Sequence, residues 1–153
     1  MDERKRINVN SRFTICLCII LISYTILLIY WMFLGFNRSY TPGALRYNII
    51  PFRTLSHYFM NFNAVSMRTW IINICGNIGV FIPFGLLLPL LCNKTNRLRT
   101  FMVMFLVPLF VVEWLQTFLH RGSFDVDDLL LNSIGALIGW GTIKLLRGYG
   151  FSS

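Results

Sequence analysis

Four long apolar runs are the feature that most constrains the fold of this 153-residue chain. Each is close to the roughly 20 residues that a helix needs to cross the hydrocarbon core of a bilayer. The runs are Phe13–Leu34, Trp70–Cys92, Phe101–Leu119 and Leu129–Leu146. Only 13% of the residues are charged, against about 25% in soluble domains. We therefore expect an all-α, polytopic membrane protein with about four transmembrane helices in the lipid bilayer.

A signal peptide is the alternative interpretation of the first run, because basic residues precede it. The apolar stretch is longer than the roughly 7–15 residues of a signal peptide's apolar region. No small-x-small cleavage site follows it. We expect an uncleaved span and one transmembrane domain over residues 13–147, with cytoplasmic tails at residues 1–12 and 148–153.

The net charge of +8 does not indicate nucleic-acid binding, because the basic residues stand between apolar runs. They are typical of cytoplasmic flanks. One side of a four-span chain would carry Arg4, Lys5, Arg6, Arg12, Lys94, Arg97, Arg99, Lys144 and Arg147. The other would carry Arg38, Arg46, Arg53 and Arg68, spread over a long loop, and Arg121. This imbalance predicts that both termini lie in the cytoplasm.

The four cysteines lie inside apolar runs or at the end of one, and none has the spacing of a zinc site. They are Cys16, Cys18, Cys75 and Cys92. We interpret them as small buried apolar residues rather than redox or metal-binding groups.

Polar residues gather in the outer halves of three spans. In each span two of them are three or four residues apart and share a helix face. The pairs are Asn73 with Asn77, Glu113 with Gln116, and Asp128 with Asn132. A carboxylate inside a span is costly and normally faces protein or a water-filled cavity. We predict that the pairs meet in one outward-facing polar site.

Structural roles compete with this prediction. Asp127 or Asp128 could cap the fourth helix by accepting backbone N–H bonds at its positive end. The asparagine side chains could form hydrogen bonds that join neighbouring helices. Arg121 could pair with Asp125 in the loop alone. A purely structural role explains Glu113 least well.

Proline and glycine mark two further backbone features. Pro83, Pro89 and Pro108 fall inside spans, where each frees a carbonyl that lipid cannot satisfy. Neighbouring helices or polar groups must then supply donors. Gly135 and Gly139 are four residues apart and predict close packing of the fourth helix.

The long outer loop, Gly35–Arg68, contains "YNIIPFRTLSHYF", a half-apolar stretch too short to span. We expect Tyr47–Phe59 to lie in the interface, with a short amphipathic helix after Pro51. Arg53 and His57 are four residues apart and would face one direction. His57 is then either a pH-sensitive ligand or base, or an interfacial bystander.

Four blocks of the chain resemble, in order, the motifs of the VanZ-like membrane family. They are "YNIIPFRTL", "INICGNIGVFIPFGLLLPLL", "VEWLQ" and "FDVDDLLLNSIGALIG", from about Asn48 to Gly139. The resemblance implies a cell-envelope protein, most often Gram-positive, akin to an accessory protein of resistance to the glycopeptide teicoplanin. The family's recurrent polar positions correspond to Asn73, Asn77, Glu113, Gln116, Arg121, Asp125, Asp128 and Asn132. The resemblance assigns them no catalytic role.

Three functions fit these residues. The first is binding of a lipid-linked or lipid-anchored envelope component, which would lower glycopeptide access. The second is an enzyme on a phosphate-bearing lipid, with Arg53 and Arg121 on the phosphate and Glu113 as the candidate catalytic acid or base. Asp125 and Asp128 are weak candidates for Mg²⁺ in that enzyme. The third is a structural or partner-binding bundle.

Overall fold

Four helices long and apolar enough to cross a membrane carry the fold of the computed structural model, which describes residues 11–35, 43–61 and 65–149. The spans are Ser11–Leu34, Met67–Leu91, Leu98–Phe118 and Val126–Gly148. The predicted all-α architecture with four transmembrane helices is confirmed. Each span begins two or three residues before the predicted apolar run, because the first turn of each helix uses more polar sequence.

Three spans are single helices and the second is segmented. The single helices are α1 (Ser11–Leu34), α6 (Leu98–Phe118) and α7 (Val126–Tyr149). The second span comprises α3 (Met67–Ile71), the π-helix η1 (Ile72–Gly76), α4 (Asn77–Gly79) and α5 (Ile82–Leu91). The connections contain β1 (Tyr47–Asn48), α2 (Arg53–Met60), the 3₁₀ helix η2 (Asn93–Asn96) and β2 (Phe124–Asp125). The short helix predicted after Pro51 is α2.

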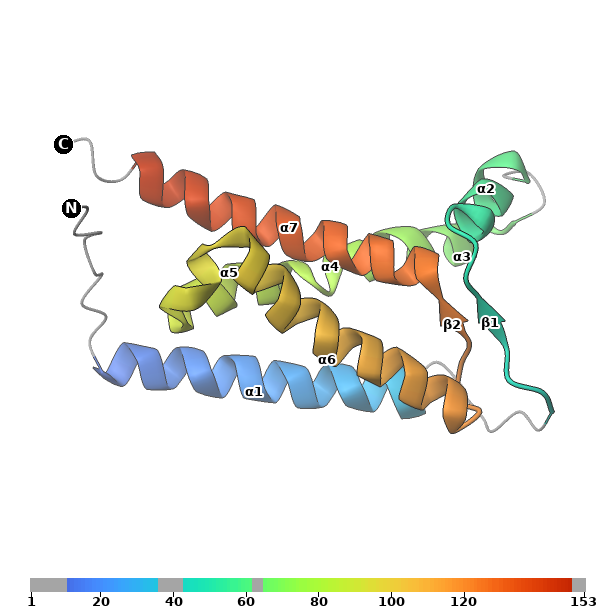
Figure 1. The fold of residues 1–153 in the computed structure, drawn as a ribbon, viewed down its shortest axis with the longest axis horizontal. Helices are drawn as coiled ribbons and strands as arrows, with labels where there is room; N and C mark the ends of the chain where they lie inside the picture. The colour runs from blue at the N-terminus through green and yellow to red at the C-terminus, as the bar shows by residue number, and fades with distance from the viewer. Residues whose placement is uncertain (1–10, 36–42, 62–64, 150–153) are drawn as a thin grey trace.

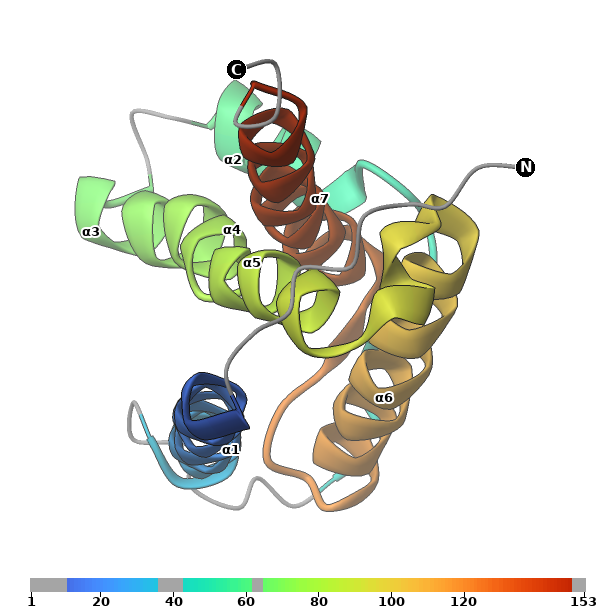
Figure 2. The same ribbon diagram turned by 90° about the vertical axis from the view of Figure 1, so that its left-hand side faces the viewer.

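The spans give the molecule two ends, at the left and right of Figure 1. The start of α1, η2 and the end of α7 lie at one end, here called the η2 end, which faces the viewer in Figure 2. The other end carries α2, β1 and β2 and is called the α2 end. An even number of spans places the start of α1 and the end of α7 together.

The second span breaks between α4 and α5, where the sequence predicts one continuous run. Pro83 lies in the first turn of α5, where its missing N–H costs nothing and its fixed φ favours a helix start. The carbonyl of Val80, at the break, accepts a hydrogen bond of 2.7 Å from the Tyr24 hydroxyl of α1. A neighbouring helix thus supplies the donor that lipid cannot.

Glycines bring the backbones of α4, α5 and α7 into contact. A Cβ added at Gly135 would lie 2.0 Å from the Ile78 carbonyl oxygen, and one at Gly85 would lie 2.0 Å from the Ala136 carbonyl oxygen. At Gly139 the Ile82 carbonyl oxygen would be 2.2 Å away. No side chain fits at these distances, so the predicted small face of the fourth span is where the helices meet.

An apolar core fills the centre of the bundle beside these glycines. Its buried members are Phe81, Phe101, Phe105, Leu109 and Ala136. The Phe81 and Phe105 rings meet edge to face with centroids 5.7 Å apart, a favoured aromatic geometry. α1 adds the Tyr24 ring, 5.6 Å from that of Phe84. Much of α1 is exposed apolar surface, which suits contact with lipid.

The cysteines differ from expectation in their burial. Cys16 and Cys75 are exposed, whereas Cys18 and Cys92 are half-buried, and all four are free thiols. The prediction that they are buried inside the protein is therefore wrong. In a bilayer a small apolar side chain can face lipid as readily as protein.

Candidate functional site

A polar layer lies on the apolar core, toward the α2 end. One helical turn beyond Leu109 on α6 is Glu113, and one turn before Ala136 on α7 is Asn132. These two side chains are 5% and 1% exposed. Asn77 of α4 lies four residues before Phe81, which stands in the break between α4 and α5. Three spans thus change from apolar to polar at the same level, and we call Asn77, Glu113 and Asn132 the polar layer.

Two spans are joined by a hydrogen bond next to this layer. The Asn77 amide donates to the Asp128 carboxylate at 2.8 Å. Asn132 is one turn below Asp128 on the same face of α7. The Asn132 amide oxygen is buried and has no hydrogen-bond partner among the described residues. Such an oxygen is uncommon in folded proteins and leaves an acceptor for a donor group from elsewhere.

The Asp127 carboxylate binds the first turn of α2. It accepts backbone N–H bonds from Phe52 at 2.6 Å, Thr54 at 2.8 Å and Leu55 at 3.1 Å. These are the donors that a helix leaves unsatisfied at its start, where a negative charge is favourable. Asp127 is fully buried, so it fixes α2 onto the start of α7.

Asp125 joins three segments at the same place. One carboxylate oxygen accepts from the Asn48 amide at 3.0 Å and from the Asp127 backbone N–H at 2.9 Å. The other accepts from the Thr54 hydroxyl at 2.5 Å. Asp125 therefore caps α7, whereas the carboxylate of Asp127, one of the two predicted caps, turns to α2. Asn48 and Asp125 are also register partners in the parallel β1–β2 pair.

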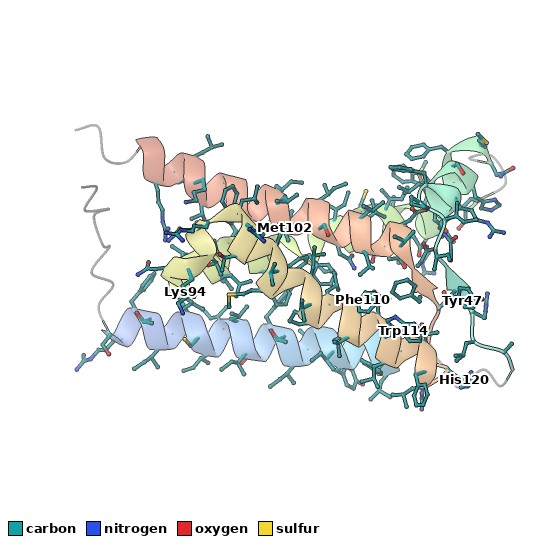
Figure 3. The ribbon with its side chains drawn as sticks, viewed as in Figure 1. Tyr47, Lys94, Met102, Phe110, Trp114 and His120 are labelled. Atoms are coloured by element: carbon teal, nitrogen blue, oxygen red, sulfur yellow. The ribbon has the colours of Figure 1, made fainter. Side chains whose placement is uncertain are left out.

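Aromatic side chains of α6 hold β2 in position. The Phe110 and Phe124 rings are 5.5 Å apart, and the Trp114 and Phe124 rings 6.0 Å. Figure 3 shows Phe110 and Trp114 near β2, in the half of α6 toward the α2 end. Because Phe124 precedes Asp125, this packing also positions the Asp125 carboxylate.

Tyr58 of α2 lies near the aspartates. Burial, followed by the negative charges of Asp128 and Asp125, raises the pKa of the Tyr58 phenol. The phenol therefore stays neutral at physiological pH and keeps its O–H donor. Tyr58, Arg53, Thr54, Ser56, His57, Met60 and Asn61 line an open pocket of about 450 Å³.

Two predicted site residues, Asn73 and Gln116, donate hydrogen bonds outside the aspartate contacts. Asn73, in η1, donates to the Thr69 carbonyl of α3, in the same span, at 2.8 Å. Gln116 donates to the Met32 carbonyl of α1. Arg121 is half-buried in the turn after α6, and Arg53 is exposed at the start of α2. Within the second span, Asn73 thus bonds to its own span, whereas Asn77 bonds to Asp128 of α7.

Sequence reasoning missed Asn48, Thr54, Tyr58 and Asp127 as parts of this region. The first three lie in or beside "YNIIPFRTL", the block that resembles the family. Their polarity was the available signal, but Asn48 and Thr54 bond to aspartates more than 70 residues away along the chain. Within residues 11–35, 43–61 and 65–149, no group of three or more His, Cys, Asp or Glu could hold a metal ion. The Mg²⁺ role of Asp125 and Asp128 stays a prediction.

The comparison with known families bears on the whole region described above. A family model described as VanZ/LLP1 matches residues 21–147, which include all four spans in whole or in part, the polar layer and the aspartates. No curated protein and no solved structure matches the chain.

Proposed function

The chain belongs to the VanZ/LLP1 family, and we propose that it binds a lipid-linked or lipid-anchored component of the cell envelope and thereby lowers susceptibility to teicoplanin. It is a membrane protein with four spans. In this proposal it resides in the plasma membrane of a Gram-positive cell. The bound component enters from the α2 end, which faces outward.

The buried polar layer is the observation that carries this proposal. Glu113 and Asn132 are buried beside an apolar core, at a level where a purely structural bundle would continue with apolar side chains. Polar groups at this depth are costly and are usually retained for function. The unpartnered Asn132 oxygen supplies an acceptor for a hydroxyl or amine of the bound head group.

The α2 segment supports the choice of a lipid-borne ligand. Its exposed apolar residues, Phe52, Phe59 and Met60, suit the membrane interface, as in other interfacial helices. Asp127 and Asp125 hold this segment over the start of α7. A ligand with an apolar tail in the bilayer would meet α2 and the polar layer together.

The proposed orientation places both termini in the cytoplasm. The η2 end carries Lys94, Arg97, Arg99, Lys144 and Arg147 on its described segments. Basic residues flanking spans favour the cytoplasmic side. The polar layer then lies in the outer half of the membrane, where teicoplanin, which carries an acyl chain, encounters its target.

Expression in a susceptible Gram-positive host tests the proposal, with teicoplanin and vancomycin inhibition as the readout. Glu113→Gln removes the ionisable carboxyl group with little change in size and should abolish the teicoplanin effect while membrane protein levels stay normal. Asn93→Asp, at an exposed position of the η2 end, is the matched control and should keep the effect. Full resistance at normal protein levels in both Glu113→Gln and Asp128→Asn would exclude the site.

A further inference from the structure

The η2 end carries cations from two segments that are far apart in the sequence. Lys94 belongs to η2, Arg97 immediately precedes α6, Arg99 lies in the first turn of α6, and Arg147 lies at the end of α7. The first three are exposed, and Lys94 marks this end in Figure 3.

The described residues place no carboxylate side chain near these cations. All four described carboxylates, Glu113, Asp125, Asp127 and Asp128, lie in the half of the molecule toward the α2 end. The remaining acidic residues, Asp2 and Glu3, lie outside the described part of the chain. Among the residues that the structure describes, the charged side chains of the η2 end are therefore all cationic.

Arg147 connects the two cationic segments. Its Nη2 donates to the Pro89 carbonyl at 2.9 Å, and its Nη1 donates to the Asn96 amide oxygen. Its Nε is buried, with no acceptor in the part of the chain that the structure describes. Both acceptors are uncharged, so the guanidinium charge is not neutralised by them. Partly buried charge without a counter-charge is costly.

The scaffold under these cations is fixed. Thr95 is fully buried, and its hydroxyl donates to the Leu88 and Cys92 carbonyls. The indole N–H of Trp140 donates to the Thr95 carbonyl at 2.9 Å. These contacts hold η2 between α5 and α7, so the cations project from a rigid turn rather than from a mobile loop.

We propose that Lys94, Arg97, Arg99 and Arg147 bind the phosphate of an anionic phospholipid in the adjacent leaflet. Cations at the ends of spans lie at the depth of the lipid head groups. Arginine forks match phosphate oxygens, and a phosphate would neutralise Arg147. The binding uses the end opposite the polar layer, so it is independent of the envelope-component proposal.

Native mass spectrometry of the full chain tests this, with an equimolar mixture of phosphatidylglycerol and phosphatidylcholine as the probe. The wild type should bind phosphatidylglycerol preferentially, and the preference should weaken in high salt. The double variant Lys94→Gln/Arg97→Gln changes two exposed residues and should lose about fivefold in preference for each cation removed. Arg46→Gln/Arg68→Gln makes the same charge change at exposed positions toward the α2 end and should keep it.

Three results would overturn the proposal. The wild type could show no preference for phosphatidylglycerol. Both double variants could lose the preference equally, which would show that it depends on net charge alone and not on the η2 end. Alternatively, inorganic phosphate could displace phosphatidylglycerol, which would show that the site is not made for a lipid. Each of these outcomes leaves the teicoplanin readout of Glu113→Gln unaffected, so the two proposals fail separately.

Discussion

The carboxylate of Asp127 lies 2.6 Å from the backbone nitrogen of Phe52, a residue 75 positions earlier in the chain. Phe52 has a φ of 64°, a left-handed conformation that is unfavourable for a bulky residue. Such strain costs about 1–3 kcal/mol, and a hydrogen bond to a charged carboxylate offsets it. The contact therefore sets both the backbone of Phe52 and the position of α2.

Asp127→Asn should release α2 from the start of α7. The amide keeps one acceptor oxygen, and its NH₂ group would oppose the N–H donors of Thr54 or Leu55. We expect a local loss of about 1–3 kcal/mol, measured as faster hydrogen exchange at residues 52–56 with α7 unchanged. Ser56→Ala is the control, because its hydroxyl donates to the Arg53 carbonyl of the same helix. Unchanged exchange in Asp127→Asn would show that other contacts hold α2.

Two glycines of α7 should respond oppositely to the same substitution. Gly139→Ala places a Cβ 2.2 Å from the Ile82 carbonyl oxygen, and the required backbone shift should cost about 1–3 kcal/mol. Gly141→Ala meets nothing within 4 Å and should stabilise the helix by about 0.5–1 kcal/mol. Thermal unfolding in detergent measures both. Equal stability of the two variants would contradict the close approach of α5 and α7.

The spans and α2 could be predicted from the sequence because their signals are local. Apolar length defines a span, and Pro51 precedes α2 at a helix start. The paired glycines likewise identified the packing face of α7. These features depend on a residue and its near neighbours along the chain.

The missed features depend on tertiary contacts. η1 occupies Ile72–Gly76, and a π-helix has more residues per turn than an α-helix. Asn73 donates to the Thr69 carbonyl within its own span, whereas Asn77 donates to Asp128 of α7. Asp127 was interpreted as a candidate cap for its own helix, but its carboxylate binds the N–H groups of α2. No local sequence pattern distinguishes an aspartate that caps its own helix from one that caps a distant helix.

Tyr58 gives a pH dependence with a defined sign. Burial and the charges of Asp128 and Asp125 raise its pKa above 10.0, so the folded protein favours the neutral phenol. The contribution of the neutral Tyr58 phenol to the free energy of unfolding is fully present below the unfolded pKa of about 10. It is lost as the pH rises through the higher pKa of the folded protein. The difference in tyrosinate absorbance between the wild type and Tyr58→Phe isolates this titration. Asp128→Asn should lower the midpoint of the Tyr58 titration. A midpoint that does not change in Asp128→Asn would argue against the proximity of Tyr58 and Asp128.

Cysteine labelling tests which end faces the cell exterior. In a background with the four native cysteines replaced, Ser123→Cys and Asn93→Cys each place one thiol at an exposed position, at opposite ends of α6. A membrane-impermeant maleimide should label Ser123→Cys in intact cells and Asn93→Cys only after permeabilisation, since the basic η2 end favours the cytoplasm. The reverse pattern would place the polar layer in the inner leaflet, where an external envelope component could not reach Glu113 and Asn132.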